Sequence, residues 1–208
     1  SIIQDAVDET NETLIVNLSS AVNASINDGS GTLTITDDDG LPSITIDDVT
    51  TASEIAANQS ITLRLSGASE NNVTVDWSTQ NGTATASSDY QNSSGTATFA
   101  ANAVTTTIAV PILSDNLSEA NETFNILLAN PTNAIIGDNS SIVTITDDDT
   151  LSLSIADAST ADETQALQSI IVTLSNASTT TVTVAYATAD NTATAGADYL
   201  LTSGTLTF

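Results

Sequence analysis

The segment Val143-Thr144-Ile145-Thr146-Asp147-Asp148-Asp149 repeats an earlier one, Leu33-Thr34-Ile35-Thr36-Asp37-Asp38-Asp39. In both copies apolar residues alternate with threonines, which is typical of a half-buried β-strand, and three aspartates follow. Two carboxylates about 5 Å apart repel each other by about 3 kcal/mol at an effective dielectric constant of about 20. A cluster of several such groups therefore needs a cation, or it must remain splayed in water. We predict that each triad ends one β-sandwich, begins the link to the next and binds a cation.

The chain supplies almost no cations of its own. It has 208 residues, of which 26 are acidic and one is basic, and its formal net charge is -25. Nucleic acids and anionic membrane surfaces require clustered Lys or Arg, so we expect neither as a partner. The chain has no Cys, which excludes disulfides, thiol catalysis and thiolate metal sites.

The composition favours a folded and extracellular chain. Hydrophobic residues make up 40% of the sequence and alternate regularly, whereas a disordered chain has too few apolar residues to form a core. No apolar run approaches the roughly 20 residues of a membrane helix, so we expect no direct membrane insertion in this segment. The absence of Lys, Met and Cys leaves little for trypsin-like proteases or oxidants to attack, which favours a secreted or cell-surface location. A salt-adapted acidic proteome would have a similar composition.

The sequence contains an internal repeat with a period of roughly 110 residues, the size of a sandwich domain. Residues 1–39 match 111–149, and residues 41–99 match 150–208, both without gaps. We therefore divide the chain into the C-terminal half of one repeat (1–39), a complete repeat (40–149) and the N-terminal half of another (150–208). This division is typical of a window on a longer tandem array. Alternatively, neighbouring chains complete each other's half-repeats by strand exchange, which would make a filament.

Within the complete repeat, period-2 patterns predict about seven strands separated by Asn, Gly, Asp and Ser clusters. Their marker residues are Ile44 and Ile46; Ile61, Leu63 and Leu65; Val73, Val75 and Trp77; Ala97 and Phe99; Ile108, Val110 and Ile112; Phe124, Ile126 and Leu128; and Val143 and Ile145. We predict an all-β fold of immunoglobulin-like antiparallel β-sandwich repeats in tandem. The aromatic residues share the inward side of these strands, so we assign them to the core and not to a ligand platform.

Acidic residues recur where the predicted strands end. Asp115, Glu119 and Glu122 share one loop, Asp147 to Asp149 close the last strand, Asp89 precedes Tyr90, and Glu54 follows the first strand. Calcium takes six to eight oxygen ligands and tolerates irregular geometry, whereas zinc, copper and iron prefer His or Cys. The pattern thus favours Ca2+.

Four motifs occur in order along the complete repeat: Ser88-Asp89-Tyr90, the segment 95–99, Asp115-x-x-x-Glu119-x-x-Glu122-Thr123-Phe124, and the closing aspartate triad. Together they resemble the Calx-beta family, whose members are β-sandwiches that bind calcium at one tip. The resemblance covers essentially the whole chain. It implies calcium ligands at Glu54, Asp89, Asp115, Glu119, Glu122, Asp147, Asp148 and Asp149.

The same positions carry over to the partial copies. In the first they are Asp5, Glu9, Glu12, Asp37, Asp38 and Asp39, and in the last they are Glu163 and Asp198. Richer sites in the family have further acids where this chain has Ser114, Asn116 and Asn121, so the resemblance implies fewer ions or weaker binding. The alternative is that these acids only keep the surface soluble, because a charge run is usually a solvated face.

These features predict a non-enzymatic calcium-binding tandem module of a large secreted or cell-surface protein, serving as a spacer, adhesin stalk or extracellular fibre. Its partners would be neighbouring repeats of the same chain or identical chains, and calcium would stiffen the joints between them. The alternatives are a regulatory calcium sensor of a membrane protein and a ligand-binding adhesive domain. Two carboxylates could also cleave a glycosidic bond, but repetition of the whole acidic set favours a structural role.

Glycans are a further expected partner, because the chain contains many Asn-x-Ser/Thr sequons. Most are expected by chance in a chain this rich in Asn, Ser and Thr. They lie at Asn11, Asn17, Asn23, Asn58, Asn72, Asn81, Asn92, Asn116, Asn121, Asn139 and Asn176.

Overall fold

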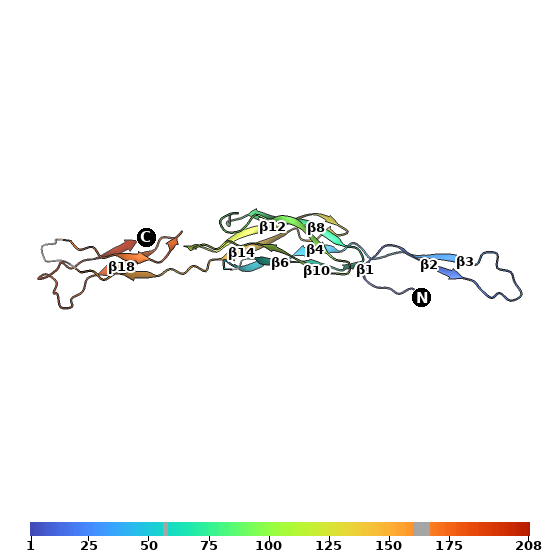
Figure 1. The fold of residues 1–208 in the computed structure, drawn as a ribbon, viewed down its shortest axis with the longest axis horizontal. Helices are drawn as coiled ribbons and strands as arrows, with labels where there is room; N and C mark the ends of the chain where they lie inside the picture. Colours follow the sequence, from blue (N-terminus) through green and yellow to red (C-terminus); the bar gives the residue numbers. More distant parts are fainter. Residues whose placement is uncertain (56–57, 160–166) are drawn as a thin grey trace.

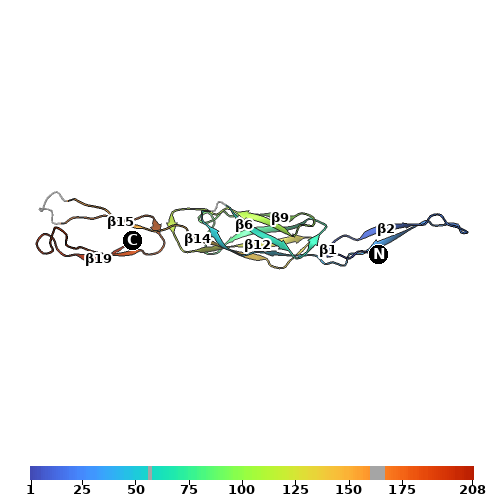
Figure 2. The ribbon, with the colours of Figure 1, turned by 90° about the horizontal axis from the view of Figure 1, so that it is seen from below.

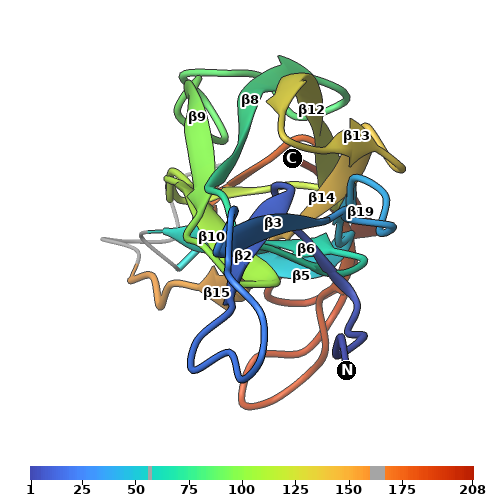
Figure 3. The same cartoon turned by 90° about the vertical axis from the view of Figure 1, so that its right-hand side faces the viewer.

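The computed structural model describes residues 1–55, 58–159 and 167–208, and these residues form strands, turns and loops without any helix. The molecule is elongated, with a complete sandwich at its centre and an incomplete module at each end (Figures 1 and 2). Seen along the long axis, the N-terminal hairpin lies in front of the central sandwich (Figure 3). In the described residues, no helix is long and apolar enough to span a bilayer.

The central sandwich consists of two sheets. The four-stranded sheet has the order β10-β6-β4-β13, and its strands are Thr105–Val110, Gln59–Leu65, Ser43–Ile46 and Ile135–Ile136. The five-stranded sheet has the order β5-β14-β12-β8-β9, and its strands are Val49–Ser53, Ser140–Thr146, Glu122–Thr132, Val73–Asn81 and Ser94–Phe99.

Alternation along the strands builds one core between the sheets. In β6, Ile61, Leu63 and Leu65 are buried, and the residues between them face outward. Tyr90 and Phe124 stack at the centre, with ring centroids 4.1 Å apart and an interplanar angle of 14°. The hydroxyl of Tyr90 donates a hydrogen bond of 2.6 Å to Asn81 Oδ1, so a buried phenol keeps its polar partner.

The prediction of an all-β sandwich is confirmed, but two strand pairs run parallel. β5 pairs with β14, and β13 pairs with β4, both in parallel. A period-2 pattern identifies the buried face of a strand, but it contains no information on the direction of the neighbouring strand. The sequence patterns did not predict β5 or β13 at all.

One predicted strand is too long. The pattern extended a strand to Ile112, but β10 ends at Val110. Pro111 follows and has no N–H with which to continue the ladder. Ile112 remains buried and forms an isolated bridge with Tyr90.

The two ends of the molecule hold open half-modules. At the N-terminal end, β2 (Glu12–Asn17) and β3 (Ser30–Ile35) form an antiparallel hairpin. At the C-terminal end, β15 (Leu153–Ile155) pairs with β16 (Val172–Leu174), and β18 (Thr183–Ala187) pairs with β19 (Ser203–Thr207). Tyr186 and Phe208 lie here and are about 40% exposed. The prediction that all aromatic residues are core therefore fails for these two, because the half-module lacks an opposing layer.

Short parallel pairs join the modules at two places. β1 (Val7–Asp8) pairs with β7 (Ala68–Ser69), and β11 (Leu117–Ser118) pairs with β17 (Ala177–Ser178). The two joints occupy equivalent positions in the internal repeat. Successive modules thus connect in the same way, through a loop of one and a turn of the next.

Candidate metal centre

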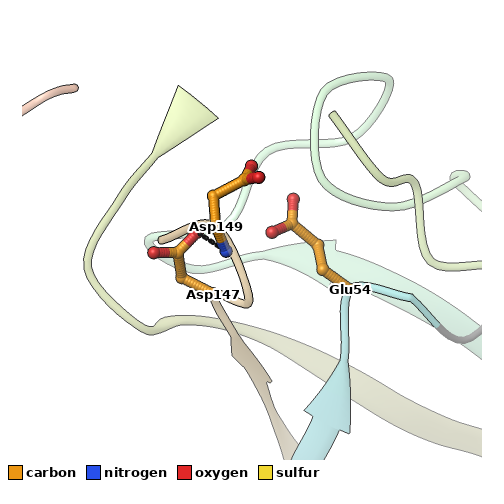
Figure 4. A group of neighbouring side chains, drawn as sticks. All are labelled: Glu54, Asp147 and Asp149. Carbon is orange, nitrogen blue, oxygen red and sulfur yellow. Dashed lines mark hydrogen bonds between the residues drawn. The ribbon is translucent and has the colours of Figure 1, made fainter. Parts of the chain in front are cut away.

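The first acidic group of the complete repeat consists of Glu54, Asp147 and Asp149, and Figure 4 shows their arrangement. One carboxylate oxygen from each lies within 4.8 Å of the others. The parallel pairing of β5 with β14 explains this proximity, because Ser53 lies opposite Thr146 and both strands end toward the same tip. Glu54 and Asp147 therefore directly follow two adjacent strands and lie side by side.

Hydrogen bonds order this group. The backbone N–H of Asp149 donates to Asp147 Oδ1 at 3.3 Å, and the hydroxyl of Ser118 donates to Asp147 Oδ2 at 3.4 Å. Asp149 Oδ2 is buried and has no hydrogen-bond partner among the described residues. A buried carboxylate oxygen without a donor is costly unless a cation or water faces it.

The second acidic group consists of Asp89, Glu119 and Glu122, whose carboxylate oxygens also lie within 4.8 Å of one another. Asp89 comes from the loop between β8 and β9, Glu119 follows β11, and Glu122 is the first residue of β12. Asp89 Oδ2 accepts hydrogen bonds from the backbone N–H of Thr85 at 2.6 Å and from its hydroxyl at 3.2 Å. These bonds fix Asp89 and leave its second oxygen for another ligand.

A cavity of about 10 Å³ joins the two groups. This volume accommodates about one water-sized sphere. Glu54 and Asp147 of the first group line it, together with all three acids of the second group, Ala120 and Ile145. The two groups thus form one continuous acidic centre at the tip of the sandwich.

The electrostatics of this centre penalise its charged form. The pKa of Glu54 is raised to about 7, first by burial and then by the charges of Asp115, Asp147, Asp148 and Asp149. The pKa of Glu122 is also raised to about 7, first by burial and then by the neighbouring Asp89 and Glu119. Burial is also the main cause of the raised pKa values of Glu119 and Asp149.

Asp115 and Asp148 lie beside the centre but in neither group. Their charges raise the pKa of Glu54, which places both near that carboxylate. Asp115 Oδ1 accepts a 2.6 Å hydrogen bond from the backbone N–H of Leu117 and so closes its own turn.

The acids of the N-terminal copy line a cavity of about 60 Å³, but among the described residues no three of them bring carboxylate oxygens within 4.8 Å of one another. Glu9 and Asp39 both have raised pKa values there. The nearby charge of Asp5 is the main cause for Glu9, and burial is the main cause for Asp39. The acids that line this cavity are Asp5, Glu9, Glu12, Asp37, Asp38 and Asp39.

In the C-terminal copy, Asp198 repeats the turn of Asp89. Its Oδ2 accepts a 2.8 Å hydrogen bond from the backbone N–H of Thr194. Asp198 is exposed and belongs to no acidic group among the described residues. Glu163, the other ligand that the resemblance implied, lies outside the described residues.

Two contacts to the acidic centre were missed in the sequence. Ser118 reaches Asp147 from β11, and the side-chain amide of Asn176 donates to Asp149 Oδ1 at 3.5 Å from the next module. The sequence identifies Asn176 only as a sequon. The corresponding residue of the first joint is Gly67, so the internal repeat gave no signal for this contact.

The donor set of the centre fits calcium. It offers only oxygen atoms, several of them from carboxylates whose mutual repulsion a divalent cation would relieve. Asp149 Oδ2 is buried without a hydrogen-bond donor, and carboxylates line the small cavity between the groups. Neither position has a positively charged partner among the described residues. Glu54, Asp147 and Asp149 would hold one ion, and Asp89, Glu119 and Glu122 would hold another.

Comparison with known proteins agrees with this architecture. The model of the Calx-beta domain matches residues 1–39, 42–149 and 146–208. A comparison with curated protein sequences gives no match.

The solved structures that match this chain include two from Calx proteins and one from Bacteroides fragilis. The apo form of the Calx CBD1 domain is 23% identical, with a TM-score of 0.49, and the match covers 53% of this chain and all of that one. The calcium binding domain CBD12 of CALX1.1 is 22% identical, with a TM-score of 0.48, and the match covers 79% of this chain and 69% of that one. A two-domain protein from Bacteroides fragilis is 10% identical, with a TM-score of 0.37 and coverages of 55% and 54%. Because the family model matches nearly every residue in successive pieces, the chain belongs to the Calx-beta domain family, with its modules arranged in tandem.

Proposed function

We propose that this chain is a non-enzymatic spacer of a secreted or cell-surface protein, in which calcium at the tip of each repeat stiffens the joint to the next. The supporting observation is the position of the acidic centre. It lies at the tip where β11 pairs with β17, and Asn176 of the next module contacts Asp149 there. An ion held by Asp149 would therefore be coupled directly to the orientation of the next module.

Charge supports the same function. Without an ion, the carboxylates of the acidic centre repel one another, and the chain has a single basic residue with which to offset this. That residue, Arg64, is already paired with Asp47 at 2.9 Å on the exposed surface. This composition and this donor set support calcium as the partner of the centre.

The location and partners follow from the composition and the joints. A chain without Cys, Lys or Met resists oxidation and trypsin-like proteolysis, which suits an extracellular stalk. The two equivalent joints support neighbouring repeats as its partners. Nucleic acid remains an unsuitable partner because the chain offers no basic patch.

Titration calorimetry on the 208-residue chain tests calcium binding directly. We expect binding in the range of extracellular modules, with a dissociation constant of about 10⁻⁴–10⁻³ M or tighter. The double variant Glu54→Gln with Asp149→Asn should lose at least one binding event, while Asp157→Asn, which removes an acid outside the centre, should bind like the parent chain. Absence of heat at millimolar calcium would refute the proposal.

Small-angle scattering tests the stiffening separately. We expect a larger maximum dimension and a narrower distribution of shapes with calcium than with chelator. Binding without any change in dimensions would retain the calcium site and reject its role in the joint.

A further inference from the structure

The first acidic group is linked to the next module at two points. The side-chain amide of Asn176 donates to Asp149 Oδ1 at 3.5 Å. The hydroxyl of Ser118 donates to Asp147 Oδ2 at 3.4 Å. The carbonyl of Ser118 in turn accepts hydrogen bonds from the backbone N–H of Thr179 at 3.0 Å and from its hydroxyl at 3.3 Å. Both aspartates of this group are therefore connected to the segment around β17.

Asn176 is half-buried beside the acids, but its bond to Asp149 is long. An N–H···O bond is typically about 2.7–3.2 Å long, whereas this one measures 3.5 Å. A side-chain amide carries its donors on nitrogen and its acceptor lone pairs on oxygen, and half a turn about its terminal torsion exchanges the two. The same side chain can thus present to the acidic group an oxygen of the kind that calcium accepts from Asn.

The first acidic group has room for another ligand. Calcium takes six to eight oxygen ligands, and both carboxylate oxygens of Asp147 already accept hydrogen bonds. Asp149 Oδ2 is buried without a donor, and Glu54, which is 6% exposed, places its carboxylate next to that of Asp149 (Figure 4). Among the described residues of the next module, Asn176 is the one with a side-chain hydrogen bond to this group.

We infer that the side-chain oxygen of Asn176 is a ligand of the ion that the first acidic group would hold, so that the next module completes the site. This inference rests on the proposed calcium site. Coupling between two binding events is reciprocal, so a ligand that docking brings to the ion also makes the ion strengthen docking. The second acidic group takes hydrogen bonds from Thr85 of its own module, and binding there should not depend on residue 176.

The first joint shows that the strand pairing does not need an amide at this position. Gly67 is the counterpart of Asn176, and β1 still pairs with β7 there. Neither residue has a positive φ, so the turn itself does not demand glycine. Asp8 replaces Ser118 in that joint, and its carboxylate accepts a 2.8 Å bond from Ser69 instead. Asn176→Gly is therefore a substitution that the same turn already accepts elsewhere in this chain.

Titration calorimetry with calcium on the 208-residue chain tests the ligand. Asn176→Gly should weaken one binding event by at least about fivefold and leave any other unchanged. Asn176→Asp should bind at least as tightly as the parent chain, because a carboxylate is also a calcium ligand. If Asn176 were only a hydrogen-bond donor to Asp149, the aspartate would repel that carboxylate and bind calcium no better than the glycine. Asn139→Gly, which removes an exposed amide outside the centre, is the control and should bind like the parent.

The outcomes separate this inference from the proposed function. Equal calcium binding by the parent chain and Asn176→Gly, or binding by Asn176→Asp no tighter than by Asn176→Gly, would overturn the inference alone. Absence of calcium binding by the parent chain would overturn both.

A double-mutant cycle assigns the affected ion. The variant Glu54→Gln with Asp149→Asn removes ligand charge from the first acidic group, so adding Asn176→Gly to it should cause no further loss of calcium affinity. A further loss of the same size as in the parent chain would show that residue 176 acts elsewhere and would overturn the inference.

Amide hydrogen exchange at the joint gives a readout that does not depend on binding heat. Calcium should slow the exchange of the Thr179 amide in the parent chain by at least about fivefold more than in Asn176→Gly, as reciprocity requires. The Glu70 amide, which donates to the Asp8 carbonyl at 2.9 Å in the first joint, should respond to calcium equally in both chains. Identical slowing of Thr179 in both chains would show that Ser118 couples the ion to the joint without Asn176, and would overturn the inference.

Discussion

The hydroxyl of Ser69 donates a 2.8 Å hydrogen bond to Asp8 Oδ2, and this bond crosses the joint between the first two modules. Ser69 is 2% exposed, so the bond is shielded from water. Next to it, the backbone N–H of Glu70 donates to the carbonyl of Asp8 at 2.9 Å, and the N–H of Thr10 donates to Glu70 Oε1 at 2.7 Å. The carboxylates of Asp8 and Glu70 thus tie the first two modules together.

Replacing Asp8 should loosen the first joint alone. A buried hydrogen bond to a charged group contributes about 1.5–3 kcal/mol. We therefore expect Asp8→Ala to speed the amide hydrogen exchange of Glu70 and Asn71 by about tenfold or more. Ser118→Ala, at the equivalent position of the second joint, is the control and should leave these amides unchanged. Unaltered exchange in Asp8→Ala would show that the backbone pairing and the Glu70–Thr10 bond hold the joint without the Asp8 carboxylate.

Glu54→Gln should have opposite effects on the apo and calcium-bound states. Without calcium, the substitution removes a buried charge that faces other carboxylates, so at pH 7.5 the melting temperature should rise. With calcium, it removes a ligand charge, and the affinity should fall by about tenfold. Melting curves with chelator and over a calcium titration measure both effects. Asp138→Asn, an exposed acid elsewhere, should change neither.

The pH dependence of stability without calcium follows from the raised pKa values of Glu54 and Glu122. Both have a pKa of about 7 in the folded state and an ordinary value of 4.5, so between these pH values the folded state binds more protons than the unfolded state. Stability therefore decreases as pH rises through this window. Denaturant titrations with chelator from pH 4.5 to about 7.5 should show this decline.

Calcium should abolish this decline, because the ion stabilises the charged carboxylates and displaces their protons. Calcium affinity should therefore increase over the same pH range. The double variant Glu54→Gln with Glu122→Gln should have a flatter profile without calcium. A parent chain whose stability rises steadily toward pH 7 in chelator would contradict this assignment.

The stacked pair at the centre should dominate the stability of the complete repeat. Phe124 is fully buried against Tyr90, and truncating a buried Phe costs about 3–5 kcal/mol. Phe124→Ala should lower the unfolding free energy of the central sandwich by that amount. Leu14→Ala, at the equivalent position of the N-terminal hairpin, should lower the same unfolding free energy by less than about 1 kcal/mol. Denaturant unfolding followed by the fluorescence of Trp77 reports on the central sandwich.

The sequence predicts only part of the acidic centre. The patterns predicted acids at strand ends, and the structure brings Glu54, Asp147 and Asp149 together. They did not predict β5, whose parallel pairing with β14 is the cause of that proximity. They also did not predict Asn176, because its counterpart in the internal repeat is Gly67 and the contact crosses between modules.

The sequence by itself determined the class of fold, the repeat of roughly 110 residues and the segments that carry the acids, because the period-2 pattern and the internal matches are local properties of the chain. Only the tertiary structure decided which acids meet. Glu54 and Asp147 are far apart in sequence, and the direction and partner of a strand depend on packing that no single segment specifies. The same holds for the two ends, where the apolar pattern resembles that of a core but Val16 and Ile155 remain exposed for lack of an opposing layer.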